Sequence, residues 1–338
     1  MRWSRSGALP SVHAASARER TLLCLPRVVA SLLVLCTACS AGPANGGQQV
    51  RAVPLFEHGA EAPARIGSLE LLGAYDLRAR DPDFGGLSGA RLDGDRLVLL
   101  SDRSSVFELG WPGAIDGGAF TMPVHDKVRL RAARGQLLDA EALALTAEGD
   151  LLVGDETDAA VYRFPRGQRF PVAQPWRLPP AFTAGATANV GLESVASLAD
   201  GTVIAIAEGL QSEAGGHALA LLGEGGTVVK IYRAGPGFQP TDADVAGDRL
   251  LVLERRFTLM RGWQSRIAAV PLSAVQDDDN DVLEGVELAA WGGATLGENY
   301  EGLAVRQEAD GTFLIVVVAD SNFSPLQRSR LLALRWRP

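Results

Sequence analysis

The chain has 338 residues, 47% of them hydrophobic, and a formal net charge of −8. Residues 1–38 carry five arginines and one glutamate, so the rest of the chain has a net charge of about −12, which excludes nucleic acid and anionic headgroups as favoured partners. All the cysteines (Cys24, Cys36 and Cys39) lie near the N-terminus, so the rest of the chain has no disulfide and no thiol chemistry.

The N-terminus has the pattern of an export signal. A positively charged segment ends at Arg27, and the apolar run 28–38 that follows is too short to span a bilayer. The run ends in Ala38-Cys39, which looks like a bacterial lipobox, so we expect residues 1–38 to be a lipoprotein-type signal peptide and Cys39 to be lipidated. Residues 39–65 are expected to be a flexible linker. The protein is then a membrane-anchored lipoprotein or, alternatively, a plainly secreted or periplasmic protein.

From about Leu69 the chain reads as short aliphatic strands, each preceded by Gly and Asp turn residues. The strongest of these strands cover 96–102, 150–156, 202–208, 249–255 and 312–320. No long stretch has helical periodicity, so residues 66–338 are predicted to form one all-β domain.

The strands fall into a repeat. Each unit has a polar anchor, a short strand, a turn, a stronger strand and an acidic end. The anchors are spaced by 53, 52, 51 and 57 residues and are Ser88, Glu141, Glu193, Asp244 and Glu301. This period predicts a β-propeller of five blades, or of six if a further blade lies between Asp155 and Glu193. The last unit lacks one strand, and 68–77 could supply it and close the ring by pairing the two ends of the chain.

The acidic residues should converge. The start of one strand and the end of the next lie at the same end of an antiparallel hairpin, and the first strand of each blade lines the propeller axis. The carboxylates expected at this mouth are Asp102, Asp139, Glu141, Asp155, Glu156, Glu193, Glu208, Asp242, Asp244, Glu254, Glu301 and Asp320. Carboxylates so close need protons, arginines or cations, and hard oxygen ligands suit Ca²⁺, or Mg²⁺ with more retained water.

Other hydrolytic motifs are absent from the sequence. Gly86-Leu87-Ser88-Gly89 has the wrong spacing for a Gly-x-Ser-x-Gly elbow, and there is no His-Glu-x-x-His zinc motif. The Arg-His-Gly signature of histidine acid phosphatases is also missing.

Four segments carry a family resemblance: GGLSGARLDGDRLVLLSD, DAEALAL, GLESVASLADGTVIAIAE, and NYEGLAV with its following ADSNF. Over about residues 66–337 the chain resembles the family described as esterase-like activity of phytase. The resemblance implies an exported propeller that hydrolyses phosphate esters or phosphodiesters. By matching position it implies catalytic roles for Glu193, Glu301, Glu254 and Arg255, and metal binding by Glu141, Glu156, Glu208, Asp320 and Asn322. The chain departs from the family pattern at Ala142 and Ser194, where Gly is usual, and at Asp242-x-Asp244, which replaces the Glu motif.

The main hypothesis is a metal-assisted hydrolase of phosphate esters, in which Arg255 or Arg103 holds the anion and a carboxylate acts as general base. The rival hypothesis is a non-catalytic, membrane-anchored propeller that binds a protein, a glycan or a small ligand. A lactonase-like propeller with calcium is a third reading. In each case we expect a monomer whose only membrane contact is the lipid anchor.

Overall fold

A computed structural model describes the chain at residues 48–56, 62–171, 175–179, 182, 191–210, 215–223 and 225–338. The expected signal peptide and the expected lipidation site, Cys39, lie outside the described residues. Among the described residues, none of the helices has the length and apolar character needed to cross a membrane.

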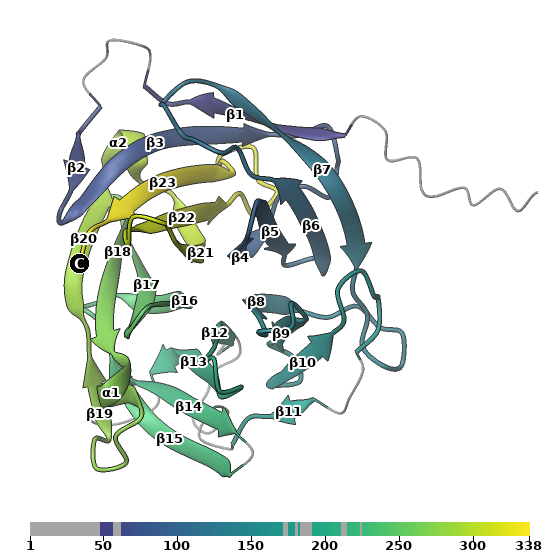
Figure 1. Ribbon diagram of the computed structural model, residues 1–338, viewed down its shortest axis with the longest axis vertical. Coiled ribbons are helices and arrows are strands. Elements are labelled where there is room, and N and C mark those ends of the chain that lie inside the picture. Colours follow the sequence, from purple (N-terminus) through teal and green to yellow (C-terminus); the bar gives the residue numbers. More distant parts are fainter. Residues whose placement is uncertain are drawn as a thin grey trace, which may run out of the picture. The chain divides into compact units, whose positions relative to one another are not determined.

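The strands of the described residues form five successive antiparallel runs (Figure 1). The first run is β4 (Leu87–Asp93), β5 (Arg96–Ser101), β6 (Ser105–Gly110) and β7 (Phe120–Arg129). The second is β8 (Ala140–Leu145), β9 (Leu151–Asp155), β10 (Ala160–Phe164) and β11 (Trp176–Arg177). The third is β12 (Leu192–Ser197), β13 (Val203–Leu210), β14 (His217–Gly223) and β15 (Gly226–Arg233), with β19 (Val282–Glu284) parallel at its edge.

The fourth run is β16 (Gln239–Ala246), β17 (Arg249–Thr258), β18 (Gly262–Pro271) and β20 (Val286–Gly292). The fifth is β21 (Asn299–Gln307), β22 (Phe313–Asp320), β23 (Arg330–Trp336) and β3 (Leu69–Arg78), with β2 (Arg65–Ile66) paired to β3. The two described helices are single turns, α1 (Leu272–Val275) and α2 (Gly293–Leu296).

The runs are arranged as a ring. The innermost strands β4, β8, β12, β16 and β21 contact one another in that order, and β21 contacts β4 again (Figure 1). This is the expected β-propeller architecture, and the all-β prediction is confirmed. Because β1 (Gln49–Pro54) joins the first and last runs into one continuous sheet, the sheets do not by themselves count the blades, and the number five stays a prediction.

The ring closes as expected, by pairing of segments from the two ends of the domain. Strand β3 pairs antiparallel with β23, for example Tyr75 with Leu331. The structure adds β1, which lies between β3 and β7 in the stretch expected to be a linker. Val50 and Ala52 of β1 are fully buried, so this strand packs as part of the domain.

The local sequence explains the hairpins. The β4–β5 and β16–β17 loops have two residues each, and their glycines, Gly94 and Gly247, have φ of 56° and 63°, a conformation that glycine accepts without strain. The aliphatic strands fill the space between neighbouring runs. Val98 of β5, for example, lies in one buried cluster with Leu143 of β8 and Val153 of β9.

A buried arginine on β4 joins the inner strands. Arg91 is 3% exposed and donates to both carboxylate oxygens of Asp242, at 2.9 and 3.0 Å. It also donates to the carbonyls of Val195, Ala243 and Leu303, at 2.6, 2.7 and 2.6 Å. These groups come from β12, β16 and β21, so one side chain links four of the inner strands.

Asp242 and Asp244, expected at the acidic mouth, take part in this strand-to-strand bonding. Asp242 accepts a hydrogen bond from the Leu303 N–H at 2.7 Å, and Asp244 accepts one from the Val305 N–H at 2.8 Å. Both carboxylates therefore hold β16 against β21.

Candidate functional site

Each inner strand has an irregularity at the same place. The register with the second strand of its hairpin shifts by one residue near the start of the inner strand. A residue left over in this way is a β-bulge, and its side chain is re-aimed relative to the regular ladder. We call these residues the bulge ring: Ser88, Glu141, Glu193, Thr241 and Glu301. The fourth anchor is therefore Thr241, and the expectation of Asp244 at this place is wrong.

The hydroxyl members of the bulge ring bind the neighbouring strand. The Ser88 Oγ donates to the Ala140 carbonyl at 2.7 Å, and the Thr241 Oγ1 donates to the Tyr300 carbonyl at 3.2 Å. Each acceptor directly precedes a glutamate of the ring. The small members thus position the strands that carry Glu141 and Glu301.

A second set of equivalent residues lies at or near the end of the second strand of each hairpin. The N–H groups of three of them bond to carbonyls of the inner-strand entry: Asp102 to Gly86, Glu156 to Asp139 and Glu208 to Gly191, at 2.8, 3.0 and 3.1 Å. The other two, Arg255 and Asp320, are the strand partners of Gln239 and Asn299, the first residues of β16 and β21. We call this set the strand-end ring: Asp102, Glu156, Glu208, Arg255 and Asp320.

The acids of the two rings, together with Asp139, form what we call the acidic cluster, which consists of Asp102, Asp139, Glu141, Glu156, Glu193, Glu208, Glu301 and Asp320. In the fourth run the rings contain Thr241 and Arg255 in place of two acids. The acidic cluster therefore has one cation built into its own repeat.

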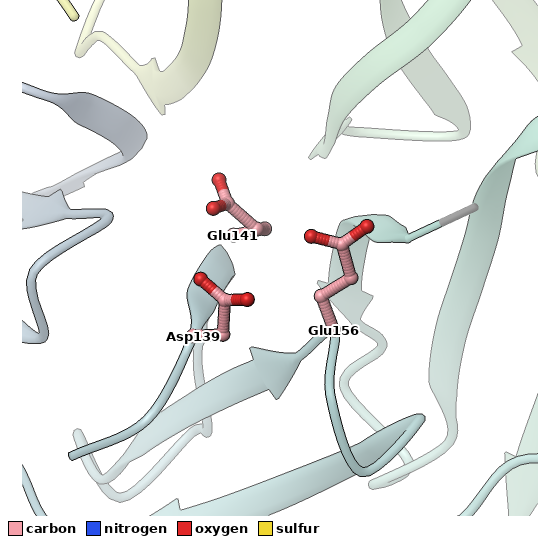
Figure 2. A group of neighbouring side chains, drawn as sticks. All are labelled: Asp139, Glu141 and Glu156. Carbon is pink, nitrogen blue, oxygen red and sulfur yellow. The ribbon is translucent and has the colours of Figure 1, made fainter. Parts of the chain in front are cut away.

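Three carboxylates of the cluster lie side by side (Figure 2). One carboxylate oxygen each from Asp139, Glu141 and Glu156 lies within 4.8 Å of the other two. Asp139 is exposed, while Glu141 and Glu156 are partly buried, so solvent reaches this group from one side.

The close approach of Glu156 and Glu193 depends on a glycine. A Cβ atom on Gly191 would lie 2.8 Å from Oε1 of Glu193 and 2.9 Å from Cδ of Glu156. A side chain here would require both carboxylate groups to shift. The Gly-Leu-Glu entry of β12 therefore brings an acid of the bulge ring next to one of the strand-end ring.

Arg255 binds the other side of the cluster. It forms an ion pair with Glu208 at 3.2 Å and a closer one with Glu301, and it also donates to the Asn299 side chain. Asn299 in turn donates to Glu301 at 2.7 Å. The Arg255 guanidinium lies 5.6 Å from the centre of the Trp263 ring.

Burial and mutual repulsion hold protons on these acids. Burial, followed by the charges of Glu193 and Glu301, raises the pKa of Glu141 to about 10. Burial, followed by the charge of Glu208, raises the pKa of Glu193 well above its usual value, although Arg255 opposes the shift. Burial and Glu301 raise the pKa of Asp320 to about 7. The cluster therefore ionises fully only when further positive charge is present.

Glu254 makes different contacts. It is fully buried, accepts from the Tyr232 hydroxyl at 2.6 Å and the Gly235 N–H at 2.9 Å, and pairs with Arg266 at 3.0 Å. Its position in the repeat is one residue before the strand-end ring, which Arg255 occupies. The structure does not bring Glu254 to the other expected site residues.

The segment after β22 holds the last expected residues. The Asn322 side chain donates to Gln327 at 2.9 Å, and its N–H donates to Asp320 at 2.5 Å. The Arg103 guanidinium lies 3.4 Å from the centre of the Phe323 ring. Arg103 is exposed and stands beside Asp102, at the edge of the acidic cluster.

Sequence reasoning missed Thr241 and the part played by Gly191. A signal for Thr241 was present, since Gln239-Pro240-Thr241 aligns with Asn299-Tyr300-Glu301 when the strand entry is used. Asp244 was expected at this position instead because it is acidic, like the anchors Glu141, Glu193 and Glu301.

The family model described as "Phytase-like: Esterase-like activity of phytase" matches residues 82–323. A search of curated proteins finds no matching sequence. Among solved structures, the chain is similar to glutaminyl cyclase of Myxococcus xanthus, with 11% identity, a TM-score of 0.43, and coverage of 78% of this chain and 95% of that one. It is also similar to a putative gluconolactonase, with 13% identity, a TM-score of 0.39, and coverage of 88% and 99%. These two likenesses are too weak to carry a functional conclusion.

Proposed function

The chain belongs to the family described as esterase-like activity of phytase, and from that premise we propose that it is an exported hydrolase that cleaves phosphate esters with a divalent metal ion at the acidic cluster. The observation that carries this proposal is the convergence of Asp139, Glu141 and Glu156, whose oxygens lie within 4.8 Å of one another. The family match supports hydrolysis, and the carboxylates support the metal.

The three carboxylates fit a calcium ion. Oxygen ligands of Ca²⁺ lie about 2.3–2.6 Å from the ion, so two of them can be up to about 5 Å apart. The raised pKa of Glu141 also favours a bound cation. That carboxylate stays ionised at neutral pH only if a cation offsets its burial and the negative charges of its neighbours. All the donors are hard oxygens, which suit Ca²⁺, or Mg²⁺ with more water.

A metal ion also explains how a phosphate could enter. The acidic cluster alone would repel an anion, and Arg255 is already paired with Glu208 and Glu301. When bound, a divalent cation supplies the positive charge that attracts and polarises a phosphoryl oxygen and that acidifies a nearby water. With the cation bound, the guanidinium of Arg255 provides a second positive group that can contact the phosphate.

The remaining roles follow from the contacts of each side chain. Glu193 is the proposed general base. Burial raises its pKa, so it becomes a strong proton acceptor once a bound cation lets it ionise. It takes the proton of the attacking water, the bond between phosphorus and the ester oxygen breaks, and the alcohol leaves with a proton from solvent. Glu301 accepts from both Arg255 and Asn299, so we assign it the role of orienting Arg255.

The export and the anchor are part of the proposal. The sequence pattern before Cys39 supports a lipid-anchored protein outside the cytoplasm. We propose that the domain acts there as a monomer on small phosphate esters.

The test is turnover of a panel of aryl phosphates and aryl esters by the purified protein. A chelator should abolish hydrolysis, and Ca²⁺ or Mg²⁺ should restore it. Glu193→Gln should lower kcat by a factor of about 100 or more at an unchanged or higher Tm. Glu284→Gln, at a side chain that is 64% exposed in the outer strand β19, is the matched control and should behave as the parent.

Two results would overturn the proposal. Hydrolysis that is indifferent to the chelator removes the metal from the reaction. Absence of turnover on every substrate, in a folded protein that binds Ca²⁺, leaves the acidic cluster as a ligand-binding site and favours the non-catalytic reading.

A further inference from the structure

A groove lined by both apolar and polar residues lies at the tip of the β17–β18 hairpin. It has a volume of about 660 Å³, and its walls come from three parts of the fold. Met260 and Trp263 belong to the hairpin, Gly293 and Gly297 flank α2, and Leu326 follows β22. Arg261, Gln264, Glu298 and Gln327 also line the groove, so its apolar contacts come from Met260, Trp263, Ala294 and Leu326.

Apolar side chains around the groove are unusually exposed. Leu259 and Met260 are each 96% exposed and Leu326 is 90% exposed. Phe257, at 54%, packs on Trp263 with ring centres 5.0 Å apart. Large apolar side chains gathered in this way beside a hollow mark a binding surface, whereas scattered ones do not.

The groove lies close to Arg255, which is paired with the acidic cluster. Trp263 lines the groove, and its ring centre is 5.6 Å from the Arg255 guanidinium. Gly297 leads directly into the strand that carries Asn299 and Glu301, and Leu326 follows the strand that ends at Asp320. Each wall of the groove is thus the extension of a segment that places a residue in the two rings.

The walls are also fixed to the ring. Arg330 of β23 donates to the Thr295 carbonyl of α2 at 2.7 Å, and Asn322 donates to Gln327, a neighbour of Leu326, at 2.9 Å. These bonds hold the α2 wall and the Leu326 wall at a set place relative to the cluster. A ligand could therefore contact both places at once.

We propose that this groove binds the apolar alkyl or aryl group of the substrate, while its phosphate lies at Arg255 and the acidic cluster. The inference rests on the proposed function and narrows its substrates to amphiphilic phosphate esters. The path from Arg255 over Trp263 to Met260 and Leu326 runs from a cation to apolar surface, which matches an anionic head with an apolar tail.

The test measures binding without turnover. Methyl, butyl and octyl phosphate are titrated into the calcium-loaded, full-length protein by calorimetry. A fully buried methylene tightens binding by about 4-fold, and the groove is open, so we expect octyl phosphate to bind about 10-fold or more tightly than butyl phosphate. The ratio of the methyl to the octyl Kd should fall about 5-fold in Met260→Ser and in Leu326→Ser.

Val286→Ser is the matched control. This residue is 71% exposed on β20 and does not line the groove, so the variant should keep the parent ratio. Kd values independent of chain length, or an equal loss in the control, would overturn the inference. So would variants that lose binding to neutral phospholipid vesicles while keeping the parent ratio, because the hairpin tip would then be a membrane contact. Chain-dependent binding without any hydrolysis keeps the groove and rejects only the catalytic proposal.

Discussion

Replacing Arg91 by methionine should destabilise the ring more than any exposed charge substitution. The guanidinium forms a buried ion pair with Asp242 and donates to carbonyls of three other inner strands. Removing one partner of a buried pair costs about 3–5 kcal/mol, because the other charge stays buried without compensation. We therefore expect Arg91→Met to lower the free energy of unfolding by about 4 kcal/mol.

The loss should depend on pH in a defined direction. Burial raises the pKa of Asp242 to about 7 even with Arg91 beside it, so without the arginine the carboxyl is protonated over a wider range. A raised carboxyl pKa means that the folded state holds a proton which the unfolded state releases. The stability of both proteins should fall as pH rises from about 4 to about 7, and the gap between Arg91→Met and the parent should widen above about pH 7, where only the variant still holds the proton on Asp242.

Urea denaturation followed by fluorescence measures these differences. Arg96→Met is the control, because Arg96 is 41% exposed and its pair with Glu108 should contribute at most about 1 kcal/mol. Adding Asp242→Asn to Arg91→Met should recover about 1–3 kcal/mol, since no buried charge then remains unpaired. If Arg91→Met costs no more than Arg96→Met, the account of Arg91 as the link between the inner strands is refuted.

Three further predictions concern the site and the ring closure. In the presence of a chelator, Tm should fall as pH rises from about 4 to about 7, because the pKa of Asp320 is raised to about 7. Each such carboxyl lowers the free energy of unfolding by about 1.4 kcal/mol per pH unit. Added Ca²⁺ should remove most of this slope, and a slope unchanged by Ca²⁺ would contradict the metal site. Arg255→Gln should weaken inhibition by inorganic phosphate about 10-fold or more, whereas Arg233→Gln on an outer strand should not, and equal inhibition constants would exclude Arg255 from anion binding. Ending the chain after Gln327, which removes β23, should prevent cooperative unfolding in calorimetry, while ending it after Trp336 should not; a folded shorter chain would contradict the pairing of β3 with β23 as the closure.

The parts of the fold that follow from local patterns could be predicted. Aliphatic runs bounded by Gly and Asp turns predict the hairpins, and an even repeat of hairpins predicts a ring. The convergence of Glu141, Glu193 and Glu301 follows from the same geometry, because the two ends of a hairpin meet. The pairing of β3 with β23 could be expected because the last run lacked a strand.

Other features depend on contacts between distant parts of the chain. A bulge adds one residue to a strand without changing its composition. The spacing of the residues alone therefore does not predict that Thr241 is the fourth anchor, or that Arg255 and not Glu254 lies at the site. Arg91 stands within an ordinary aliphatic strand, and its partners Asp242 and Leu303 lie far along the chain. Strand β1 follows a stretch rich in Gly and Gln, which reads as a linker until its pairing with β3 and β7 is known.

The break in the repeat at the fourth run gives the site a direction. Five equivalent sectors would let an asymmetric ligand settle in any of five rotations about the axis, all with similar free energy. With Thr241 and Arg255, the fourth of the described runs is the one that contributes no acid to either ring, and the groove past Trp263 opens from that same run. Only one rotation then satisfies both ends of a ligand, so a fold built from repeated hairpins acquires a single binding orientation through two residues.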